Sequence, residues 1–435
     1  MRLELAQFPV KDAQFGRQTG YSQGTLQLDK EELIGLIRQD NRVTSANIDI
    51  AFPGEKMRIV NGRDVVEPRL KVSGPGCVFP GIMGPVETVG QGRTHRMSGV
   101  TIIPSADYRP TILSGTGAGS SAILDMWGPG AEVTPFASTI NIVLVLKLID
   151  DISEWEAHAT IQSAGFKVAH RLAETTRGMD SGNVEVFQLS QVDPSLPRVV
   201  YILSSSYGTG MTHSDFAYYG LPIHESLPTL ANPNEFLDGA FTSDARRGNG
   251  GFITSWALLN QPVVLKLLHE HGRQLNFLGV IIERTGFPTE LGKQVAAKAT
   301  SKMAQLLGTD DVIITRLLVG NSFIDVMLTV QACVKKDINT VLLIPERGGM
   351  EGTDLPLIFY VPEATAMVST GSIDRELKLP EPTKVIGVKQ GEMVSLYPGD
   401  PPFDPWEEFL TRQGWRDIIG GIDWFGGMNY TCDEY

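Results

Sequence analysis

Three consecutive segments indicate the fold class of this chain: Leu275-Asn-Phe-Leu-Gly-Val-Ile-Ile282, Thr289–Leu307 and Val312-Ile-Ile-Thr315. The first and last runs are apolar and rich in β-branched residues, as buried strands are. The segment between them has the length of a helix and stops at Gly308, and glycine commonly follows the last helical residue. Strand, helix and strand in this order predict a right-handed crossover and a parallel sheet.

The same alternation extends in both directions, so we expect an α/β domain with a mainly parallel sheet over residues 198–383. Its further predicted elements are the strands Val199–Leu203 and Thr340–Ile344 and the helices Pro262–His271, which ends at Gly272, and Asp325–Lys336. Ligands of such sheets bind outside the carboxyl ends of the strands. The expected rim of a site therefore consists of the loops after Leu203, Ile282, Thr315 and Ile344.

The chain before this domain has a different pattern. Residues 1–148 predict a β-rich domain with one helix at Lys30–Arg38, for which Asp29 is the expected N-cap. Its predicted strands are Thr25–Leu28, Val43–Ile50, Met57–Val60, Val100–Ile103 and Ile140–Leu148. Residues 149–197 predict a long amphipathic helix and a linker.

Residues 384–435 form a C-terminal arm rich in aromatic residues, too irregular for a regular element and too aromatic to be disordered. Two readings of this arm stay open, because it can pack across its own chain or against a partner.

Composition limits the function classes. Hydrophobic residues make up 42% and charged residues 20% of the 435 residues, as in a globular protein. The formal charge of −13 argues against nucleic-acid and anionic-membrane surfaces. The chain shows no signal-peptide pattern and no apolar run of the roughly 20 residues that a membrane helix needs. Three scattered cysteines without a C-x-x-C pair fit a reducing compartment. We therefore expect a cytoplasmic protein.

Without reference to any family, the motifs do not identify a reaction. Ser114–Ser121 is a glycine-rich run that could cradle a phosphate, but it lacks the end of a P-loop and no clean strand precedes it, which favours a flexible glycine loop. No pair of the seven histidines has metal-ligand spacing, so we expect no metal site. His95 lies in a glycine-rich loop, and His213 follows a predicted strand, where acid–base groups often lie. Both are also consistent with solvated loop residues.

A series of motifs in fixed order resembles the precursor of the α and β subunits of glycine/sarcosine/betaine reductase component B. The motifs are Leu3-Glu-Leu, Gln14-Phe-Gly16, Phe79-Pro-Gly81, Gly90-Gln-Gly-Arg-Thr-His95, Asp125–Phe136, His213, Pro228-Thr229, Asp238-Gly-Ala240, His271–Val280, Gly320-Asn321, Ser369-Thr-Gly371 and Lys384-Val-Ile-Gly387. The resemblance covers nearly nine-tenths of the chain. It implies a subunit of a reductive deaminase complex. In that family the precursor cleaves itself at an Asn–Cys bond, and the cysteine becomes a pyruvoyl group that takes the substrate amine as a Schiff base.

One departure from the family is chemical. Gly248-Asn249 matches the family's Gly-Asn-Cys stretch, but Gly250 stands where the cysteine would be, and no cysteine occurs between Cys77 and Cys333. Glycine has neither a nucleophile on its β-carbon nor a group to eliminate. We therefore expect no cleavage, no pyruvoyl group and no other cofactor at this position.

Residues that flank the departure leave alternatives open. The pairs Thr242-Ser243 and Thr254-Ser255 carry hydroxyls that could replace the cysteine in processing, although such pairs also occur in ordinary loops. Arg246 and Arg247 could bind a substrate carboxylate, or belong to a solvated loop.

The resemblance thus implies a subunit that binds a small amine and works, as part of an oligomer, with a partner subunit that carries selenocysteine or cysteine. The candidate catalytic residues are His213, Asp238, Thr242, Ser243, Asn249 and Gly250. The candidate substrate-binding residues are Arg93, His95, Glu132, Arg246 and Arg247. Two alternatives are a non-catalytic scaffold or small-molecule-binding subunit derived from the family, and a phosphate- or nucleotide-binding protein that uses Ser114–Ser121.

Overall fold

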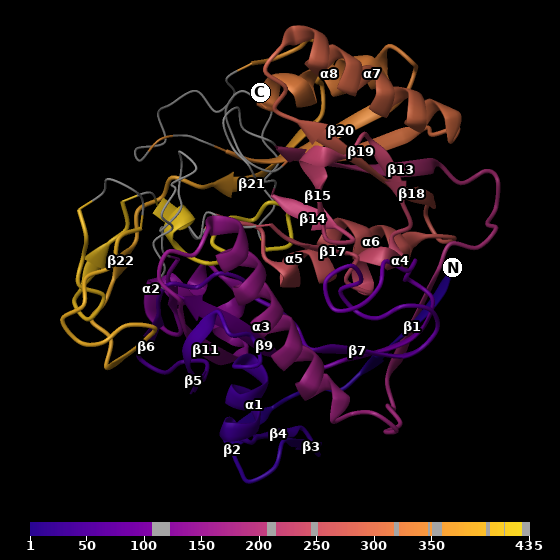
Figure 1. The fold of residues 1–435 in the computed structure, drawn as a ribbon. Helices are drawn as coiled ribbons and strands as arrows, with labels where there is room; N and C mark the ends of the chain where they lie inside the picture. The colour runs from indigo at the N-terminus through magenta and orange to yellow at the C-terminus, as the bar shows by residue number, and fades with distance from the viewer. Residues whose placement is uncertain are drawn as a thin grey trace.

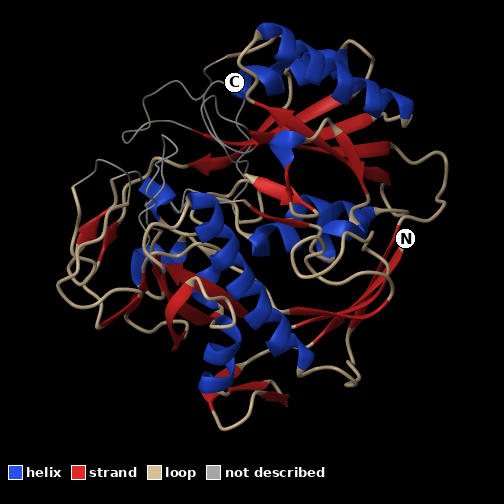
Figure 2. Ribbon diagram, in the orientation of Figure 1, coloured by secondary structure: helices blue, strands red, loops and turns tan. Residues whose placement is uncertain are grey.

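A computed structural model of the chain describes residues 1–106, 122–206, 215–244, 251–316, 322–346, 349, 359–396, 401–412 and 414–428. Helices and strands are mixed along the chain, and the expected α/β class is confirmed (Figures 1 and 2). Among the described residues, no helix is both long and apolar enough to cross a membrane.

The largest sheet has six strands in the order β16-β18-β13-β19-β20-β21. Their bounds are β13 (Arg198–Ser206), β16 (Thr229–Ala231), β18 (Asn276–Thr285), β19 (Asp311–Arg316), β20 (Asn339–Glu346) and β21 (Met367–Ser372). All neighbouring pairs are parallel except β16 with β18, which is antiparallel. The four predicted strands of this domain are confirmed as β13, β18, β19 and β20. The edge strands β16 and β21 were not predicted.

Helices cover both faces of this sheet, as Figure 1 shows. One face carries α7 (Glu290–Leu306) and α8 (Ser322–Val334), and the other carries α4 (Asn234–Leu237), α5 (Ser255–Leu259) and α6 (Pro262–Glu270). Alternate residues of β13 supply both cores, since Val200 and Ile202 pack with α7 and α8 whereas Tyr201 and Leu203 pack with α6. The predicted helices of this domain are therefore confirmed.

The order of strands defines a switch point beside β13. The chain leaves β13 toward the face that carries α4 to α6, and it leaves the neighbouring strand β19 toward the face that carries α8. Connections that depart to opposite faces open a crevice between the carboxyl ends of adjacent parallel strands. The carboxyl ends of β13 and β19 are therefore the expected place for a ligand.

Several small sheets build the first part of the chain. They are the sheets β12-β1-β8-β7, β10-β6-β23, β5-β11-β9 and β2-β4-β3. The bounds of their strands are β1 (Arg2–Gln7), β2 (Asp12–Phe15), β3 (Gly20–Ser22), β4 (Thr25–Leu28), β5 (Val43–Ala51), β6 (Met57–Ile59), β7 (Arg69–Ser73), β8 (Gly92–Arg96), β9 (Val100–Ala106), β10 (Leu124–Asp125), β11 (Ile140–Leu148), β12 (Val184–Gln188) and β23 (Lys384–Ile386). The five strands predicted here correspond to β4, β5, β6, β9 and β11.

Helices of the first part begin at clear caps. Helix α1 (Lys30–Ile37) starts at Asp29, whose carboxylate accepts the backbone N–H groups of Glu31 and Glu32 as predicted. The long helix α3 (Glu154–Glu174) starts at a capping box formed by Ser153 and Glu156. The remaining short elements are α2 (Gly128–Glu132), η1 (Pro135–Ser138), η2 (Ile223–Glu225), η3 (Gly414–Asp417), β14 (Phe216–Tyr218), β15 (Leu221–Pro222), β17 (Phe241–Ser243), β22 (Lys378–Leu379) and β24 (Phe409–Leu410).

The C-terminal arm packs across its own chain. Strand β23 adds to β6 of the first part, whereas Trp424 and Phe425 lie in the core beneath the six-stranded sheet. The first of the two readings of this arm is thus borne out for its described residues. The division of the chain at residues 148, 197 and 383 stays a prediction.

Candidate functional site

The segment 245–250, which contains Gly250, lies outside the described residues, but both of its ends are described. Strand β17 leads into it through Asp244, and Gly251 leads out of it to α5. Ser255, the first residue of α5, accepts the backbone N–H of Ser243 on its hydroxyl at 3.1 Å. The two ends of the segment are therefore fastened to each other.

A buried carboxyl supports this fastening. The Ser255 hydroxyl donates to Asp64 Oδ2 at 2.6 Å, and the Ser255 backbone N–H donates to Asp64 Oδ1 at 2.8 Å. Asp64 is only 4% exposed, and burial raises its pKa to about 7 although hydrogen bonds from Ser255 and Val65 oppose the change. We refer to Asp64, Ser243 and Ser255 as the clamp.

Helix α3 reaches the same place from the first part of the chain. Gln162 donates from its amide to the Ser243 carbonyl at 2.8 Å. One turn earlier, His158 Nε2 lies 3.6 Å from Asp244 Oδ1. The Asp244 backbone N–H donates to the Asp215 carbonyl at 3.2 Å, so the segment starts beside the chain that enters β14.

Polar side chains lie at the carboxyl ends of the parallel strands. Glu283, near the end of β18, is fully buried and accepts hydrogen bonds from Ser204 at 2.8 Å and Thr329 at 2.5 Å. Burial raises the pKa of Glu283 to about 7, against the effect of these hydrogen bonds. Arg316, the last residue of β19, is also buried. We refer to this region as the sheet edge.

Several motifs of the family resemblance meet between the two parts of the chain. The Asp238 carboxylate accepts the backbone N–H of Gly90 at 2.8 Å, the Thr94 hydroxyl and the Lys71 ammonium group. Gly81 has a positive φ of 82°, and a Cβ there would lie 2.1 Å from the Tyr219 carbonyl oxygen. These glycines and charges therefore allow backbones from distant segments to approach closely.

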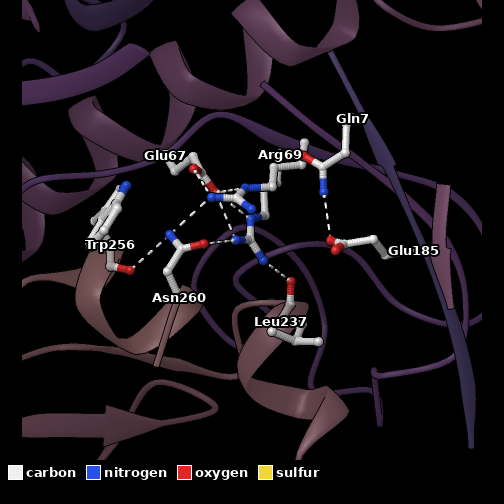
Figure 3. Close-up of polar contacts among 8 residues, drawn as sticks. Gln7, Glu67, Arg69, Glu185, Leu237, Trp256 and Asn260 are labelled. Atoms are coloured by element: carbon white, nitrogen blue, oxygen red, sulfur yellow. Dashed lines mark hydrogen bonds and ion pairs between the residues drawn. The ribbon is translucent and has the colours of Figure 1, made fainter. Parts of the chain in front are cut away.

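A second network joins the same two parts, and Figure 3 shows it. The Arg69 guanidinium donates to Glu67 at 2.7 Å, to Asn260 Oδ1 at 2.7 Å and to the Leu237 carbonyl. Burial alone would raise the pKa of Glu67, but the Arg96 and Arg69 guanidinium groups lower it below the ordinary value. We refer to this network, together with Lys71 and Asp238, as the joint.

The described candidate residues fall into separate places. Thr242 and Ser243 lie together on β17, buried, and the Thr242 hydroxyl has no hydrogen-bond partner among the described residues. Asp238 belongs to the joint, where three donors bind its carboxylate. These contacts suit a structural ion pair, and the catalytic role of Asp238 stays a prediction.

The described candidate substrate-binding residues form no hydrogen bond with the clamp. Arg93 pairs with Glu4 at 2.8 Å. His95 is 3% exposed, its Nδ1 lies 2.9 Å from the Thr176 hydroxyl, and burial lowers its pKa. Glu132 is exposed at the end of α2. Their assignment to a substrate stays a prediction.

The remaining candidates, His213, Arg246, Arg247, Asn249 and Gly250, lie outside the described residues, as does the run Ser114–Ser121. The described cysteines lie elsewhere. Cys333 is buried in α8, where burial raises its pKa to about 12, and Cys77 is half-buried with a raised pKa. Neither belongs to the chain that enters or leaves the segment 245–250, and the absence of a pyruvoyl group stays a prediction.

An open cavity of about 240 Å³ borders the chain that leaves the segment. Aromatic side chains line much of it, together with the Asp423 carboxylate. They are Phe136, Phe252, Trp256, Trp424 and Phe425. Phe136 and Trp256 meet edge to face with ring centroids 5.3 Å apart. Rings of this kind can hold a methylated cation.

Sequence reasoning placed the rim at the loops after the parallel strands but missed Glu283 and Arg316, which give the rim its polarity, and Asp64 of the clamp. Arg316 directly follows the predicted strand Val312–Thr315, so its position at the rim could have been predicted from the sequence. Asp64 could not, because it lies 191 residues from its partner Ser255.

Comparison with known proteins gives the family. The family of glycine/sarcosine/betaine reductase component B subunits matches residues 1–400. The chain is 32% identical over 405 residues to the glycine reductase complex component B subunits alpha and beta of Acetoanaerobium sticklandii, covering 92% of both chains. It is 33% identical to the sarcosine reductase complex component B subunit alpha of Peptoclostridium acidaminophilum, covering 89% of this chain and 90% of that protein.

The betaine reductase complex component B subunit alpha of Peptoclostridium acidaminophilum is 30% identical over 398 residues, with 89% of this chain and 88% of that protein covered. No solved structure matches the chain. These matches cover nearly the same part of the chain as the motifs, which run from Leu3 to Gly387. The chain belongs to the family of glycine/sarcosine/betaine reductase component B subunits.

Proposed function

We propose that this chain is a subunit of a reductase complex in which it binds a small amine or amino acid for reductive cleavage of a C–N bond. A partner subunit with a selenocysteine or cysteine supplies the nucleophile. The chain works without self-cleavage and without a pyruvoyl group. Membership of the family supports the assignment to a complex, since the relatives are named as components of glycine, sarcosine and betaine reductase complexes.

The observation that carries the proposal is the contrast between the clamp and residue 250. Asp64, Ser243 and Ser255 hold the two ends of the segment 245–250 together through buried hydrogen bonds. The residue that the resemblance places at the family's cysteine position is Gly250. A buried, fully bonded support around this segment is what a substrate site needs, whereas the chemistry of pyruvoyl formation is missing from it.

The reaction can be balanced without a carbonyl. The partner's selenolate or thiolate attacks the substrate α-carbon, a C–Se or C–S bond forms, and the electron pair of the C–N bond leaves with the amine. A primary amine leaves poorly unless an iminium activates it, whereas a quaternary ammonium leaves as a neutral amine and cannot form a Schiff base at all. We therefore propose a betaine-like substrate.

A scaffold or ligand-binding subunit is the second candidate function. The same glycine at position 250 favours it, because a subunit that performs no chemistry has no need of a carbonyl. Such a subunit would bind an amine saturably and gain thermal stability, but its complex would cleave no C–N bond in any substrate.

The test combines mass and turnover. The purified chain is expected to run as one species near 47.4 kDa, unchanged by borohydride, and to support release of trimethylamine from betaine with a selenol-bearing partner subunit. Two fragments that carry a reducible carbonyl would refute the absence of processing. Binding of betaine without trimethylamine release would favour the scaffold.

The variant Gly250→Cys tests the support around the segment. If the clamp still holds a processing geometry, this variant yields fragments 1–249 and 250–435, whereas the matched control Gly251→Cys stays intact. If Gly250→Cys also stays intact, the segment lacks further groups that self-cleavage needs besides the cysteine. This result would again favour the scaffold.

A further inference from the structure

Arg316 is a buried cation whose hydrogen bonds are incomplete. It ends β19 and is 5% exposed. Its Nε and Nη2 atoms have no hydrogen-bond acceptor in the described part of the chain. Buried donors almost always have partners in folded proteins, so this guanidinium is the kind of group that a ligand completes.

The guanidinium stays charged at neutral pH. Burial lowers the pKa of Arg316 to about 9, while the nearby carboxylates of Asp215 and Asp325 oppose the change. Neither carboxylate forms a hydrogen bond with Arg316 among the described residues. Asp325 binds the Lys293 ammonium group and the Phe287 N–H, and Asp215 accepts the Ser205 hydroxyl at 3.4 Å.

Further donors lie at the same place. The guanidinium carbon lies 4.7 Å from the ring centroid of Phe323, the second residue of α8, so the charge faces the first turn of that helix. The hydroxyl of Ser322, the first residue of α8, is buried and has no partner within the described ranges. Backbone N–H groups in a first helical turn lack intrahelical partners and attract anions.

The position within the sheet agrees with a ligand site. Arg316 lies at the carboxyl end of β19, next to β13, where the connections depart to opposite faces. A chain of contacts leads from there to the clamp. Ser205 of β13 binds Asp215, whose carbonyl accepts the N–H of Asp244 at the start of the segment 245–250.

We propose that Arg316, together with Ser322 and the start of α8, binds the carboxylate of a small amino-acid-like substrate. The planar guanidinium fork matches a carboxylate with two parallel hydrogen bonds. The neighbouring Asp215 and Asp325 carboxylates disfavour a doubly charged phosphate at the same place. This inference rests on the proposed function and adds the group that recognises the acidic end of its substrate.

Calorimetry on the full chain tests the inference with betaine, sarcosine and glycine as carboxylate probes. Trimethylamine and methylamine are the matched probes that lack the carboxylate, and inorganic phosphate tests the other anion. Arg316→Met removes the charge, and Arg316→Lys keeps the charge but loses the fork. Arg198→Met is the control. Arg198 begins β13, at the amino ends of the parallel strands, where it pairs with Asp310 at 2.6 Å.

The wild-type chain and Arg198→Met are expected to bind at least one carboxylate probe with equal affinity. Arg316→Met and Arg316→Lys should bind it at least about tenfold more weakly, because a charged, bidentate hydrogen bond is lost. Ser322→Ala should weaken it by a smaller factor. Binding of trimethylamine or methylamine should not depend on Arg316.

Two results would overturn the inference, namely unchanged binding of the carboxylate probes to a folded Arg316→Met chain, or Arg316-dependent binding of phosphate but of no carboxylate. Its failure differs from failure of the proposed function. A complex that releases trimethylamine but ignores Arg316 refutes the carboxylate site alone. Arg316-dependent binding without turnover refutes the reductase reaction alone.

Discussion

Buried charges in the first part of the chain differ from those at the sheet edge. Arg58 of β6 is completely buried, donates two hydrogen bonds to Asp125 at 2.7 and 2.9 Å, and donates others to three backbone carbonyls. Arg69 of the joint is similarly occupied. At the sheet edge, Arg316 Nε and Nη2 have no acceptor within the described ranges, and the partners of Glu283 there are hydroxyl groups.

This difference separates groups that hold the fold from groups available to a ligand. A buried ion pair with all its hydrogen bonds cannot accept a further partner without being broken. A buried guanidinium with free donors raises the free energy of the folded chain until something binds it. The comparison therefore assigns structure to the first set and recognition to the second, and substitutions can test it.

The largest effect on stability is expected for Arg58→Met. The substitution leaves the Asp125 carboxylate buried without its cation and removes the donors of three carbonyls, so the free energy of unfolding should fall by about 3–5 kcal/mol. Chemical denaturation measures this change. Arg198→Met, which breaks an exposed pair with Asp310, is the control and should cost no more than about 1 kcal/mol. Equal losses in both variants would remove the basis of the comparison.

The next effect concerns pH. The folded chain keeps the proton of Glu283 up to about pH 7, whereas the ordinary pKa is 4.5. The folded state therefore binds more protons between these values, and the free energy of unfolding should fall as the pH rises through this window. The loss from this group is on the order of 3 kcal/mol over the whole window.

Glu283→Gln should flatten this dependence, because the amide stays neutral, its oxygen can accept from one of the hydroxyls of Ser204 and Thr329, and its N–H can donate to the other. Asp64, whose pKa is also about 7, contributes a second part with the same sign, so Asp64→Asn should flatten the dependence further. Denaturation curves from pH 4 to pH 8 measure both contributions. A slope in the Glu283→Gln chain equal to that of the wild type would contradict an uncharged Glu283.

Much of the fold could be predicted from sequence because its signals are local. Helix α3 begins with a capping box and α7 ends before Gly308, which has a positive φ of 70°. Strands β11 and β13 contain the apolar runs Ile142–Leu146 and Val199–Leu203. The sheet β12-β1-β8-β7 was not predicted, since Leu3 pairs with Phe187 and Gly92, which are far away in the chain.

The sequence predicted where the candidate site lies but few of the side chains that form it. The rim after Thr315 followed from the alternation of strands and helices, and Arg316 lies there. Sequence cannot tell whether a guanidinium finds an acceptor, because Arg58 and Arg316 look alike until their surroundings are known. Asp238 is the opposite case. Its motif made it a candidate catalytic residue, but Lys71, Gly90 and Thr94 already bind its carboxylate in the folded chain.

A smaller effect is expected for Asp238→Asn at the joint. The amide keeps the shape of the side chain but leaves the Lys71 ammonium group without its anion, so we expect a loss of about 2 kcal/mol in the free energy of unfolding. Turnover per folded molecule should be unchanged. A chain of normal stability that has lost turnover would instead support a catalytic Asp238.

The smallest effect is expected for Arg316→Met, and it separates the two regions best. This substitution removes a buried charge whose Nε and Nη2 atoms have no acceptor in the described part of the chain, and it introduces an apolar side chain of similar length. The free energy of unfolding should therefore change by no more than about 1 kcal/mol, and it can increase. The same substitution of Arg58 costs several times as much because that guanidinium is fully bonded. Denaturation of both variants at one pH, without added carboxylates, measures the two changes. If Arg316→Met lowered the free energy of unfolding as much as Arg58→Met does, Arg316 would stabilise the fold and would have no donors left for a ligand.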